Sequence, residues 1–399
     1  MPRLAFLFLG GAHQVLHAAP VAAELSSDTR FEITCFHASE AERAMLQRVL
    51  DLWPAQRCKV VPLTVPRAAG WMAGRQRFAS ALKIPLLLAN RRRLGDFDAV
   101  VTAERTSTLL KRLSPAVRLI HIPHGAGDRA RGFEPRLRWF DLVLVSGRKD
   151  AARMIDTGLV DASRCLVSGS IKLGAIARMQ AQRPRLFAND RPVVFYNPHF
   201  CPSLSSWPRQ GKAVLDWFAG QDEFNLIFAP HIRLFQSASR KTCDGLQAAA
   251  IPDKILVDPG SERSCDMTYT LAADIYLGDV SSQVYEFIST PRPCVFLDAH
   301  ATTWEHDPNY ACWHFGEVVR NLSDLTQALR QARARHPEYA ARQTAAWAAA
   351  MDAESGDAPA LAADHIQEFL QGQAVRVKPT RAVQPATAGA VEPMVLEST

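Results

Sequence analysis

The stretch IYLGDVSSQVYEF, residues 275–287, starts as an apolar run, breaks at Gly-Asp and resumes with helical spacing after two serines. This order predicts a buried strand, a turn and a helix, which together form the repeating unit of a parallel α/β sheet. The first N–H groups of a helix have no partner within it, and serine is a preferred capping residue. Ser281 and Ser282 therefore predict either a phosphate site or an ordinary capped helix end.

Similar apolar runs recur on both sides of this stretch and alternate with segments of helical spacing. We expect strands at 4–9, 31–36, 58–63, 98–102, 118–122, 142–145 and 165–167, and again at 192–196, 225–229, 255–257, 275–277 and 294–297. Expected helices include 40–52, 106–113, 149–157, 323–334, 340–351 and 360–370. The alternation predicts two parallel sheets with helices on both faces, that is, two Rossmann-like domains facing a central cleft.

The polar, proline-containing stretch 180–191 is the natural boundary between the two series. We expect an N-terminal Rossmann-like domain over 1–180 and a C-terminal Rossmann-like domain over 181–371, whose last helices cross back onto the first domain. Beyond residue 371 the sequence is rich in Pro, Ala, Thr and Val without periodicity, so 372–399 is predicted to be a disordered tail.

Composition limits the classes of function. The 399 residues are 48% hydrophobic and 22% charged, which indicates a globular chain. A net charge of +6 and a pI of about 8.9 favour an anionic small substrate or an anionic membrane surface over duplex DNA. No nucleic-acid-binding motif is present in the sequence. The eight cysteines are scattered singly with no C-x-x-C pair, which is typical of reduced cytoplasmic thiols rather than disulfides or a zinc site.

The N-terminal segment is predicted to be the first strand, glycine-rich turn and helix of a Rossmann-like unit. The apolar run 4–9 is short for a signal peptide and is followed by Gly10-Gly11, then by His13 and His17 four residues apart. Such a pair also resembles metal ligands, but the pattern lacks a third ligand. We therefore expect a cytoplasmic protein with no bound metal or cofactor.

The segment 66–93 mixes aromatic and aliphatic residues with several arginines. One interpretation places it on an anionic membrane, peripheral to the inner face of the plasma membrane, where a lipid-linked acceptor would lie. The other is an amphipathic helix with a solvated basic face.

Ligands of such folds bind at the carboxyl ends of the strands, so the residues that follow the strands matter most. His124 ends one strand of the first series, and His231 ends one strand of the second. A single histidine at a strand end is usually a structural hydrogen-bonding group. The combination of two such histidines with the two serines favours a functional site.

Four motifs follow one another along the chain: His124-Gly125, Tyr196-Asn197-Pro198, His231, and the signature formed by Asp279, Ser281, Ser282, Glu286 and Phe287. In this order they resemble the CDP-glycerol glycerophosphotransferase family, the teichoic-acid-type polyol-phosphate transferases. The resemblance covers roughly residues 95 to 300 and departs from the family pattern at 126–129 and 169–172, where the segments that set substrate selectivity would lie. It implies a GT-B fold in which 1–180 is the acceptor-side domain, with His13 and His17 in an acceptor-side loop, and 181–371 is the nucleotide-donor domain.

Transfer of a phosphoryl-linked group needs a base for the acceptor hydroxyl and positive groups for the leaving nucleotide. His124 is the candidate base, because an imidazole near its unperturbed pKa of about 6.5 accepts a proton at cellular pH. His231 and Arg233 would neutralise the diphosphate together with a helix dipole at Ser281 and Ser282. The remaining assignments are Glu286 to the ribose, Asp279 to the turn, and Gly125, Asp128 and Arg129 to the acceptor side.

Three hypotheses follow. The first is transfer of glycerol phosphate or a related polyol phosphate from a CDP-linked donor to a glycan or lipid-linked acceptor, in capsule or other surface-polymer synthesis. The second is a GT-B glycosyltransferase or sugar-nucleotide epimerase that uses a UDP-sugar. The third is a nucleotide-binding protein without catalytic activity, and the presence of both His124 and His231 counts against it.

Overall fold

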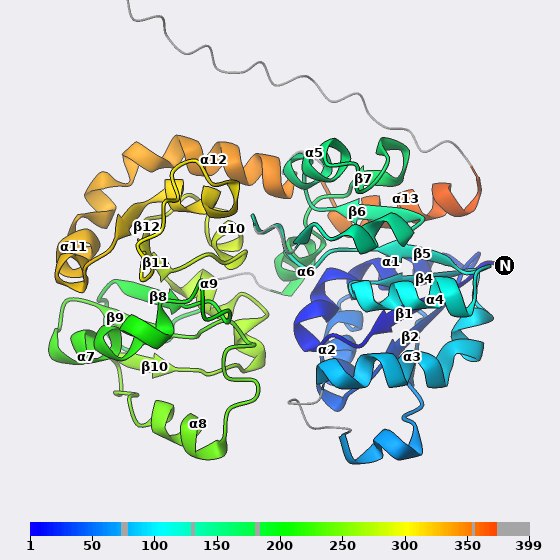
Figure 1. Ribbon diagram of the computed structural model, residues 1–399, viewed down its shortest axis with the longest axis horizontal. Helices are drawn as coiled ribbons and strands as arrows, with labels where there is room; N and C mark the ends of the chain where they lie inside the picture. Colours follow the sequence, from blue (N-terminus) through cyan, green and yellow to red (C-terminus); the bar gives the residue numbers. More distant parts are fainter. Residues whose placement is uncertain (73–78, 129–131, 180–183, 353–355, 373–399) are drawn as a thin grey trace, which may run out of the picture.

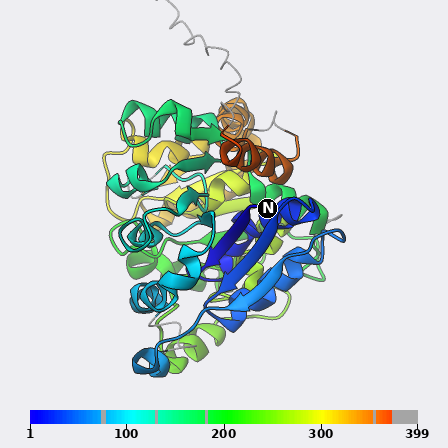
Figure 2. The ribbon, with the colours of Figure 1, turned by 90° about the vertical axis from the view of Figure 1, so that its right-hand side faces the viewer.

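The computed structural model describes residues 1–72, 79–128, 132–179, 184–352 and 356–372. Within these ranges the chain forms two parallel sheets that lie side by side, each with helices on its faces (Figure 1 and Figure 2). The α/β fold expected from the sequence is confirmed. We call the part built on the first sheet the first half and the part built on the second sheet the second half. Residues 373–399 of the predicted tail lie outside the described residues.

The first sheet has the strand order β3-β2-β1-β4-β5-β6-β7, and all its paired strands are parallel. Its strands are β1 (Arg3–Phe8), β2 (Glu32–His37), β3 (Lys59–Pro62), β4 (Ala99–Thr102), β5 (Arg118–His121), β6 (Leu142–Val145) and β7 (Cys165–Val167). Its helices are α1 (Ala19–Ser27), α2 (Glu40–Leu50), α3 (Ala79–Gly95), α4 (Leu110–Leu113), α5 (Arg148–Asp156) and α6 (Ile171–Met179).

The second sheet repeats this order as β10-β9-β8-β11-β12-β13, again with parallel pairs. The short edge strand β13 was not expected from the sequence. The strands are β8 (Val193–Asn197), β9 (Asn225–Phe228), β10 (Ile255–Val257), β11 (Ile275–Gly278), β12 (Cys294–Leu297) and β13 (Glu317–Val319). The helices are α7 (Lys212–Gly220), α8 (Arg240–Gln247), α9 (Thr268–Ala272), α10 (Gln283–Phe287), α11 (Leu325–Arg335), α12 (Pro337–Met351) and α13 (Ala358–Leu370).

In both sheets the order in which successive strands are added reverses next to the first strand, between β1 and β4 and between β8 and β11. At such a point the loops that follow adjacent strands turn to opposite faces of the sheet and leave room for a ligand at the carboxyl ends. The topology therefore marks the loops after β1 and β4 in the first half and after β8 and β11 in the second. β5 and β9 pair with β4 and β8, so the loops that follow them are adjacent to these points.

Alternating side chains of β1 explain why the first sheet needs helices on both faces. Leu4, Phe6 and Phe8 belong to one buried cluster, and Ala5 and Leu7 belong to another. Successive side chains of a strand point to opposite faces, so a strand that is apolar at every position must be covered on both sides. The second sheet is likewise covered by two separate buried clusters.

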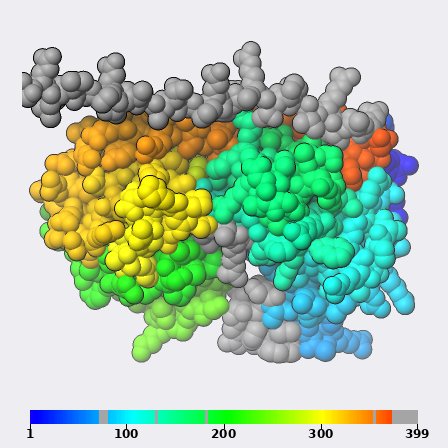
Figure 3. All heavy atoms as spheres, turned by 45° about the horizontal axis from the view of Figure 1, so that its top comes forward, coloured from blue at the N-terminus to red at the C-terminus, as the bar shows by residue number. Residues whose placement is uncertain are grey.

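The C-terminal helices connect the two halves. α12 runs along the second half and reaches α5 of the first, visible as orange beside green in Figure 3. A Cβ at Gly147 would lie 2.3 Å from the backbone carbon of Ala350, so only glycine permits this approach. α13 packs on α1 and α6, and Ala362 and Ile366 join the first-half core. The chain thus ends its described part on the half in which it began.

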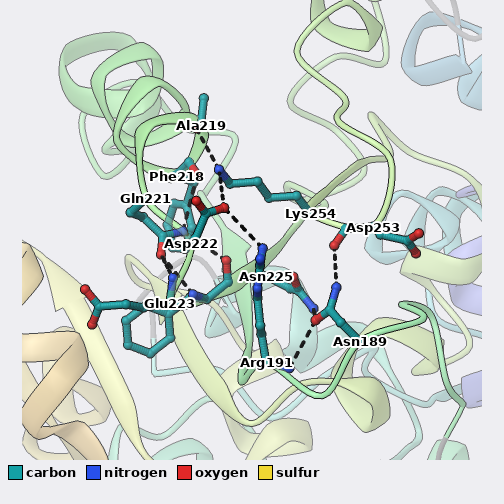
Figure 4. Close-up of polar contacts among 11 residues, drawn as sticks. Asn189, Arg191, Phe218, Ala219, Gln221, Asp222, Glu223, Asn225, Asp253 and Lys254 are labelled. Atoms are coloured by element: carbon teal, nitrogen blue, oxygen red, sulfur yellow. Dashed lines mark hydrogen bonds and ion pairs between the residues drawn. The ribbon is translucent and has the colours of Figure 1, made fainter.

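The amino ends of the second-sheet strands hold a polar network that serves the fold (Figure 4). Asn225 Nδ2 donates to Asn189 Oδ1 at 2.7 Å, and Asn189 Nδ2 donates to the Asp253 carbonyl at 2.6 Å. Lys254 pairs with Asp222 at 3.1 Å. A hollow of about 330 Å³, lined in part by Asp274, opens between the inter-half linker and this end of the sheet. These contacts lie opposite the carboxyl ends, where the sequence predicts the ligand.

Candidate functional site

Three histidines of the first half come together where β1 and β5 end. His124 follows β5, and the 3₁₀ helix η1 (Ala12–His17), which follows β1, carries His13 and His17. The ring centroid of His124 lies 5.6 Å from that of His13 and 6.5 Å from that of His17. A 3₁₀ helix has three residues per turn, so the one-face spacing expected of an α-helix does not apply. The turn itself brings both rings to His124.

Glu104 lies beside these histidines and was not predicted from the sequence. It follows β4, and its Oε1 accepts a hydrogen bond from Gln14 Nε2 at 2.6 Å and pairs with Lys83 Nζ at 2.8 Å. Gln14 Nε2 is also 3.5 Å from His124 Nδ1. In the sequence, Glu104 could have been recognised only as a carboxylate that follows an expected strand. Its partners Gln14 and Lys83 come from other parts of the chain, so no local pattern points to them.

Burial lowers the pKa of His124 to about 4, with nearby cations such as Lys83 acting in the same direction and Glu104 opposing them. The residue as a whole is solvent-exposed, and contact with water opposes the effect of burial. The direction of the shift is downward from the unperturbed pKa expected from the sequence. At neutral pH His124 is an uncharged imidazole, which has one nitrogen lone pair available to accept a proton.

The strand, turn and helix predicted at 275–287 are present, but the helix is a single short turn. β11 ends at Gly278, and α10 covers only Gln283–Phe287, preceded by Ser282 without a side-chain cap. Ser281 Oγ accepts a hydrogen bond from the Gln283 amide at 3.3 Å. The macrodipole sums aligned peptide units, so five residues contribute little of it. Any anion binding here must rely on local N–H and hydroxyl groups.

Asp279 is completely buried and holds the loop that follows β8. Its Oδ2 accepts hydrogen bonds from the backbone amides of His199 at 2.8 Å and Ser206 at 3.0 Å. Burial raises the pKa of Asp279 to about 7 against these hydrogen bonds. Its carboxylate therefore joins two loops of the second half, and a ligand would meet the turn that Asp279 shapes rather than its side chain.

The His124 loop lies directly against Ser282. A Cβ at Gly125 would be 3.0 Å from Ser282 Oγ, and one at Gly127 would be 3.2 Å from Ser282 Cβ. Gly125 also has a φ of 99°, which side-chain-bearing residues rarely adopt. The structure therefore brings the predicted base loop and the predicted phosphate turn into contact.

Asp128 strengthens the same contact between the halves. Its Oδ1 pairs with Lys149 Nζ at 2.9 Å and accepts a hydrogen bond from Tyr285 OH at 2.7 Å. The Asp128 side chain is 3% exposed. The acceptor-side role expected for Asp128 has no support in this geometry, because the carboxylate already holds its own loop to α10. Arg129, also predicted on the acceptor side, lies outside the described residues.

His231 is oriented by the backbone around it. Its Nδ1 accepts a hydrogen bond from the Arg233 amide at 3.2 Å, so in the neutral ring the proton is on Nε2. The guanidinium carbon of Arg233 lies 4.3 Å from the Phe200 ring centroid. The charges of His231 and Arg233 add to the burial that lowers the pKa of His13. These residues of the second half are thus close enough to act on the histidines of the first.

Glu286, expected to bind a ribose, forms a buried ion pair with Lys172 of α6. Lys172 Nζ lies 2.8 Å from Oε1 and 2.7 Å from Oε2. Lys172 falls in the segment where the sequence departs from the family pattern, so the resemblance did not point to it. The pairing needs residues from both halves, which sequence spacing cannot reveal.

Within the described ranges, no group of three or more His, Cys, Asp or Glu residues is arranged to hold a metal ion. No helix of the described chain has the length and hydropathy that a membrane span requires. None of the eight cysteines, all of which lie in the described ranges, forms a disulfide.

No protein-family model matches the sequence, and no curated protein matches it. Solved structures do. The S. aureus MnaA–UDP structure aligns with a TM-score of 0.65 at 14% identity, over 93% of this chain and 97% of that one. The wall teichoic acid polymerase TagF aligns at 0.62 and 12%, over 93% and 89%. UDP-GlcNAc 2-epimerase from Neisseria meningitidis, bound to UDP-GlcNAc, aligns at 0.56 and 15%, over 94% and 100%.

The fold is GT-B. The similarities span both halves of the chain, and the matched identities are low enough that they establish the fold alone. The choice between reactions therefore depends on the residues at the contact between the halves.

Proposed function

We propose that the protein transfers glycerol phosphate, or a related polyol phosphate, from a CDP-linked donor to a hydroxyl of a glycan or lipid-linked acceptor in cell-surface polymer or capsule synthesis. The observation that carries the proposal is the packing of the His124 loop on Ser282. The loop of the proposed base, from one half, is thus in contact with the proposed anion-binding turn of the other half.

In this proposal His124 takes the proton of the acceptor hydroxyl as its oxygen attacks the β-phosphorus of the donor. The bond between that phosphorus and the bridging oxygen breaks, and CMP leaves with the electron pair. A neutral imidazole suits this step because it must be unprotonated before the attack. The lowered pKa of His124 keeps it in that form throughout the neutral range.

The donor would lie on the second half. His231 Nε2–H would donate to the diphosphate, Arg233 would supply a compensating charge, and the N–H and hydroxyl groups of Ser281 and Ser282 would hold the phosphate at the turn. Glu286 would accept the ribose hydroxyls. In this proposal His231 and Arg233 would stabilise the departing nucleotide.

A UDP-sugar is the second candidate donor. Two of the aligned structures, MnaA with UDP and the N. meningitidis epimerase with UDP-GlcNAc, contain uridine nucleotides, and TagF with CDP-glycerol represents the other class. Carbon acid–base chemistry on a sugar would call on carboxylates at the site. Glu104 is a carboxylate close enough to His124 to raise its pKa, and it is engaged by Lys83 and Gln14. We prefer transfer because it needs only the histidine as a base and leaves Glu104 in these contacts.

Thermal unfolding with a nucleotide panel tests the proposal, because a ligand that binds the native state raises Tm. CDP-glycerol, CDP-ribitol and CMP should stabilise the protein, and UDP and UDP-sugars should not. Stabilisation by uridine nucleotides alone would replace the proposal with the UDP-sugar alternative. No stabilisation by any of them would contradict both and leave a protein without this donor chemistry.

The acceptor side of the proposal includes an anionic membrane surface at α3. Ile84 and Leu88 are one helical turn apart and are 51% and 41% exposed, and the neighbouring Arg91 and Arg92 are exposed as well. Apolar side chains beside cationic ones suit a bilayer that carries negative headgroups. The protein should sediment together with phosphatidylglycerol vesicles, and a smaller fraction of the double variant I84S/L88S should sediment with them. Equal binding of both proteins would overturn the membrane assignment.

A further inference from the structure

The Lys172–Glu286 ion pair is a buried link between the halves near the site. The side chains are 6% and 8% exposed, and the ammonium contacts both carboxylate oxygens. Taking two charges out of water is costly, and an apolar pair of similar size would often be no less stabilising. The presence of this pair therefore calls for a role beyond stability.

The position of the pair connects it to the site. Glu286 lies one helical turn after Ser282, which touches Gly125 of the base loop. Lys172 is the nearby charge that most lowers the pKa of His17, after burial. The ammonium thus contacts α10 through Glu286 and is near His17 at the end of η1.

The hydrogen-bonding capacity of the carboxylate is only half used by Lys172. An ionised carboxylate has two oxygens with about four lone-pair positions. Lys172 occupies one position on each oxygen, and one position remains on each. Two acceptor positions on adjacent oxygens match two vicinal hydroxyl groups, as in the 2′,3′-diol of a ribose.

We propose that Lys172 is a positioning residue for the donor nucleotide: it fixes the Glu286 carboxylate so that its remaining lone pairs accept the 2′- and 3′-hydroxyls of the ribose. Since Lys172 belongs to the first half and Glu286 to the second, recognition of the ribose then depends on contact between the halves. This inference rests on the proposed function, in that it assumes a nucleoside diphosphate at the second half.

The test compares the affinities of CDP and 2′-deoxy-CDP, with UDP and 2′-deoxy-UDP in parallel, by isothermal titration calorimetry. A hydrogen bond to a charged group contributes enough that the wild type should prefer the ribonucleotide by about tenfold or more. In Lys172→Met the carboxylate loses its orientation, and the ratio should fall towards one. In Lys172→Arg a guanidinium can again give one N–H to each oxygen, so the preference should be retained.

Lys149→Met is the matched control. Lys149, whose side chain is 25% exposed, pairs with Asp128 of the same half and lies 4.8 Å from the Tyr285 ring centroid of the second half, and its printed ion pairs are with Asp128 and Asp150 rather than Glu286. Its loss should affect the two nucleotides equally and leave the ratio at the wild-type value. If Lys172→Met shows no cooperative unfolding transition, Lys172→Gln replaces it, because the amide removes the charge and retains a polar end.

The outcomes separate the two proposals. The positioning role is supported if the preference for the ribonucleotide over the 2′-deoxynucleotide falls in Lys172→Met and keeps its wild-type value in Lys149→Met. A ratio that is unchanged in Lys172→Met, with affinity for both nucleotides reduced equally, shows that Lys172 is merely structural and overturns this inference alone. Absence of binding of any of the four nucleotides to the wild type overturns the proposed function and, with it, this inference.

Discussion

The two halves share one strand order and differ in the chemistry at their strand ends. In the first half the loops after β1 and β5 bring together His13, His17 and His124, whose pKa values are all lowered, chiefly by burial. In the second half the loop after β11 contains Asp279, whose pKa burial raises to about 7, and two serines. The same topology thus presents proton-accepting rings on one side and hydrogen-bond donors on the other.

Under the proposed function, this difference would make both halves necessary. A neutral imidazole can accept a proton but does little to hold a diphosphate, and donor groups at a turn can hold an anion but cannot accept a proton. The contact between Gly125 and Ser282 places the two kinds of group at the same point. Under the proposed function, the predictions below either break this division of roles or sharpen it.

The largest effect is expected from the base. His124→Asn removes the proton acceptor and should lower kcat by about 10² to 10⁴-fold, while the affinity for the donor changes little. Steady-state kinetics with CDP-glycerol, together with direct nucleotide titration, measure the two quantities. A kcat within a few-fold of the wild type would remove His124 from the chemistry.

The second effect concerns the donor side. His231→Ala removes an N–H donor to the diphosphate and should weaken donor binding by about tenfold to a hundredfold, with a smaller effect on kcat. Titration of CDP into the variant measures it, with His124→Asn as the comparison. Equal losses of affinity in the two variants, or a reversal, would contradict the separation of roles between the halves.

The third effect concerns the contact itself. Gly125→Ala places a Cβ 3.0 Å from Ser282 Oγ on a backbone with a φ of 99°. Strained backbone of this kind costs about 1 to 3 kcal/mol, so the variant should be less stable by that amount. Denaturant unfolding measures the loss, and Gly125→Ala/Ser282→Gly should recover only the steric part. An unchanged stability would mean that the loops do not pack as described.

The fourth prediction concerns Glu104, whose charge raises the pKa of His124 against burial. In Glu104→Gln this charge is absent, and the pKa of His124 should fall further. The acidic limb of the kcat profile should therefore move to lower pH, whereas a purely structural change would lower kcat at all pH values alike. Activity measured from pH 4 to 8 distinguishes the two.

The smallest effect concerns how the free energy of unfolding changes with pH. The change has opposite signs for a buried histidine of the first half and a buried aspartate of the second. Burial lowers the pKa of His121 to about 3, whereas an unfolded histidine has about 6.5. The stability linked to His121 is therefore present above pH 6.5 and is lost as the pH falls towards 3. Burial raises the pKa of Asp279 to about 7, whereas an unfolded aspartate has a pKa of about 3.9. The stability linked to Asp279 is therefore lost as the pH rises from 4 to 7.

Chemical denaturation of wild type and Asp279→Asn between pH 4 and 8 measures the second contribution. The free energy of unfolding of the variant should increase relative to that of the wild type as the pH rises, by at most about 1.4 kcal/mol per pH unit. A constant difference across this range would show that Asp279 keeps its ordinary pKa in the folded protein.

Much of the fold could be predicted from the sequence because parallel strands buried on both faces are continuous apolar runs. The runs at 142–145, 165–167 and 294–297 coincide with β6, β7 and β12. β13 could not be predicted, because Glu317–Val319 is short and lies at a sheet edge, where pairing depends on the neighbouring strand. The 3₁₀ form of η1 also escaped prediction, since its histidines are spaced as for an α-helix.

The site could be predicted only where one motif carried its own signal. His124, His231 and Ser282 follow strands, so topology alone points to them. Lys172 and Glu104 owe their roles to partners more than 20 residues away along the chain, Glu286 and Lys83 respectively, and no local pattern encodes such a pair.

The most direct test of the account is a crystal structure of the protein with bound CDP, or with UDP if only that nucleotide stabilises it. The account predicts the diphosphate within hydrogen-bonding distance of Ser281, Ser282 and His231, the ribose on Glu286, and His124 facing the β-phosphate. A nucleotide bound elsewhere, for example in the hollow beside Asp274 at the amino ends of the strands, would contradict it.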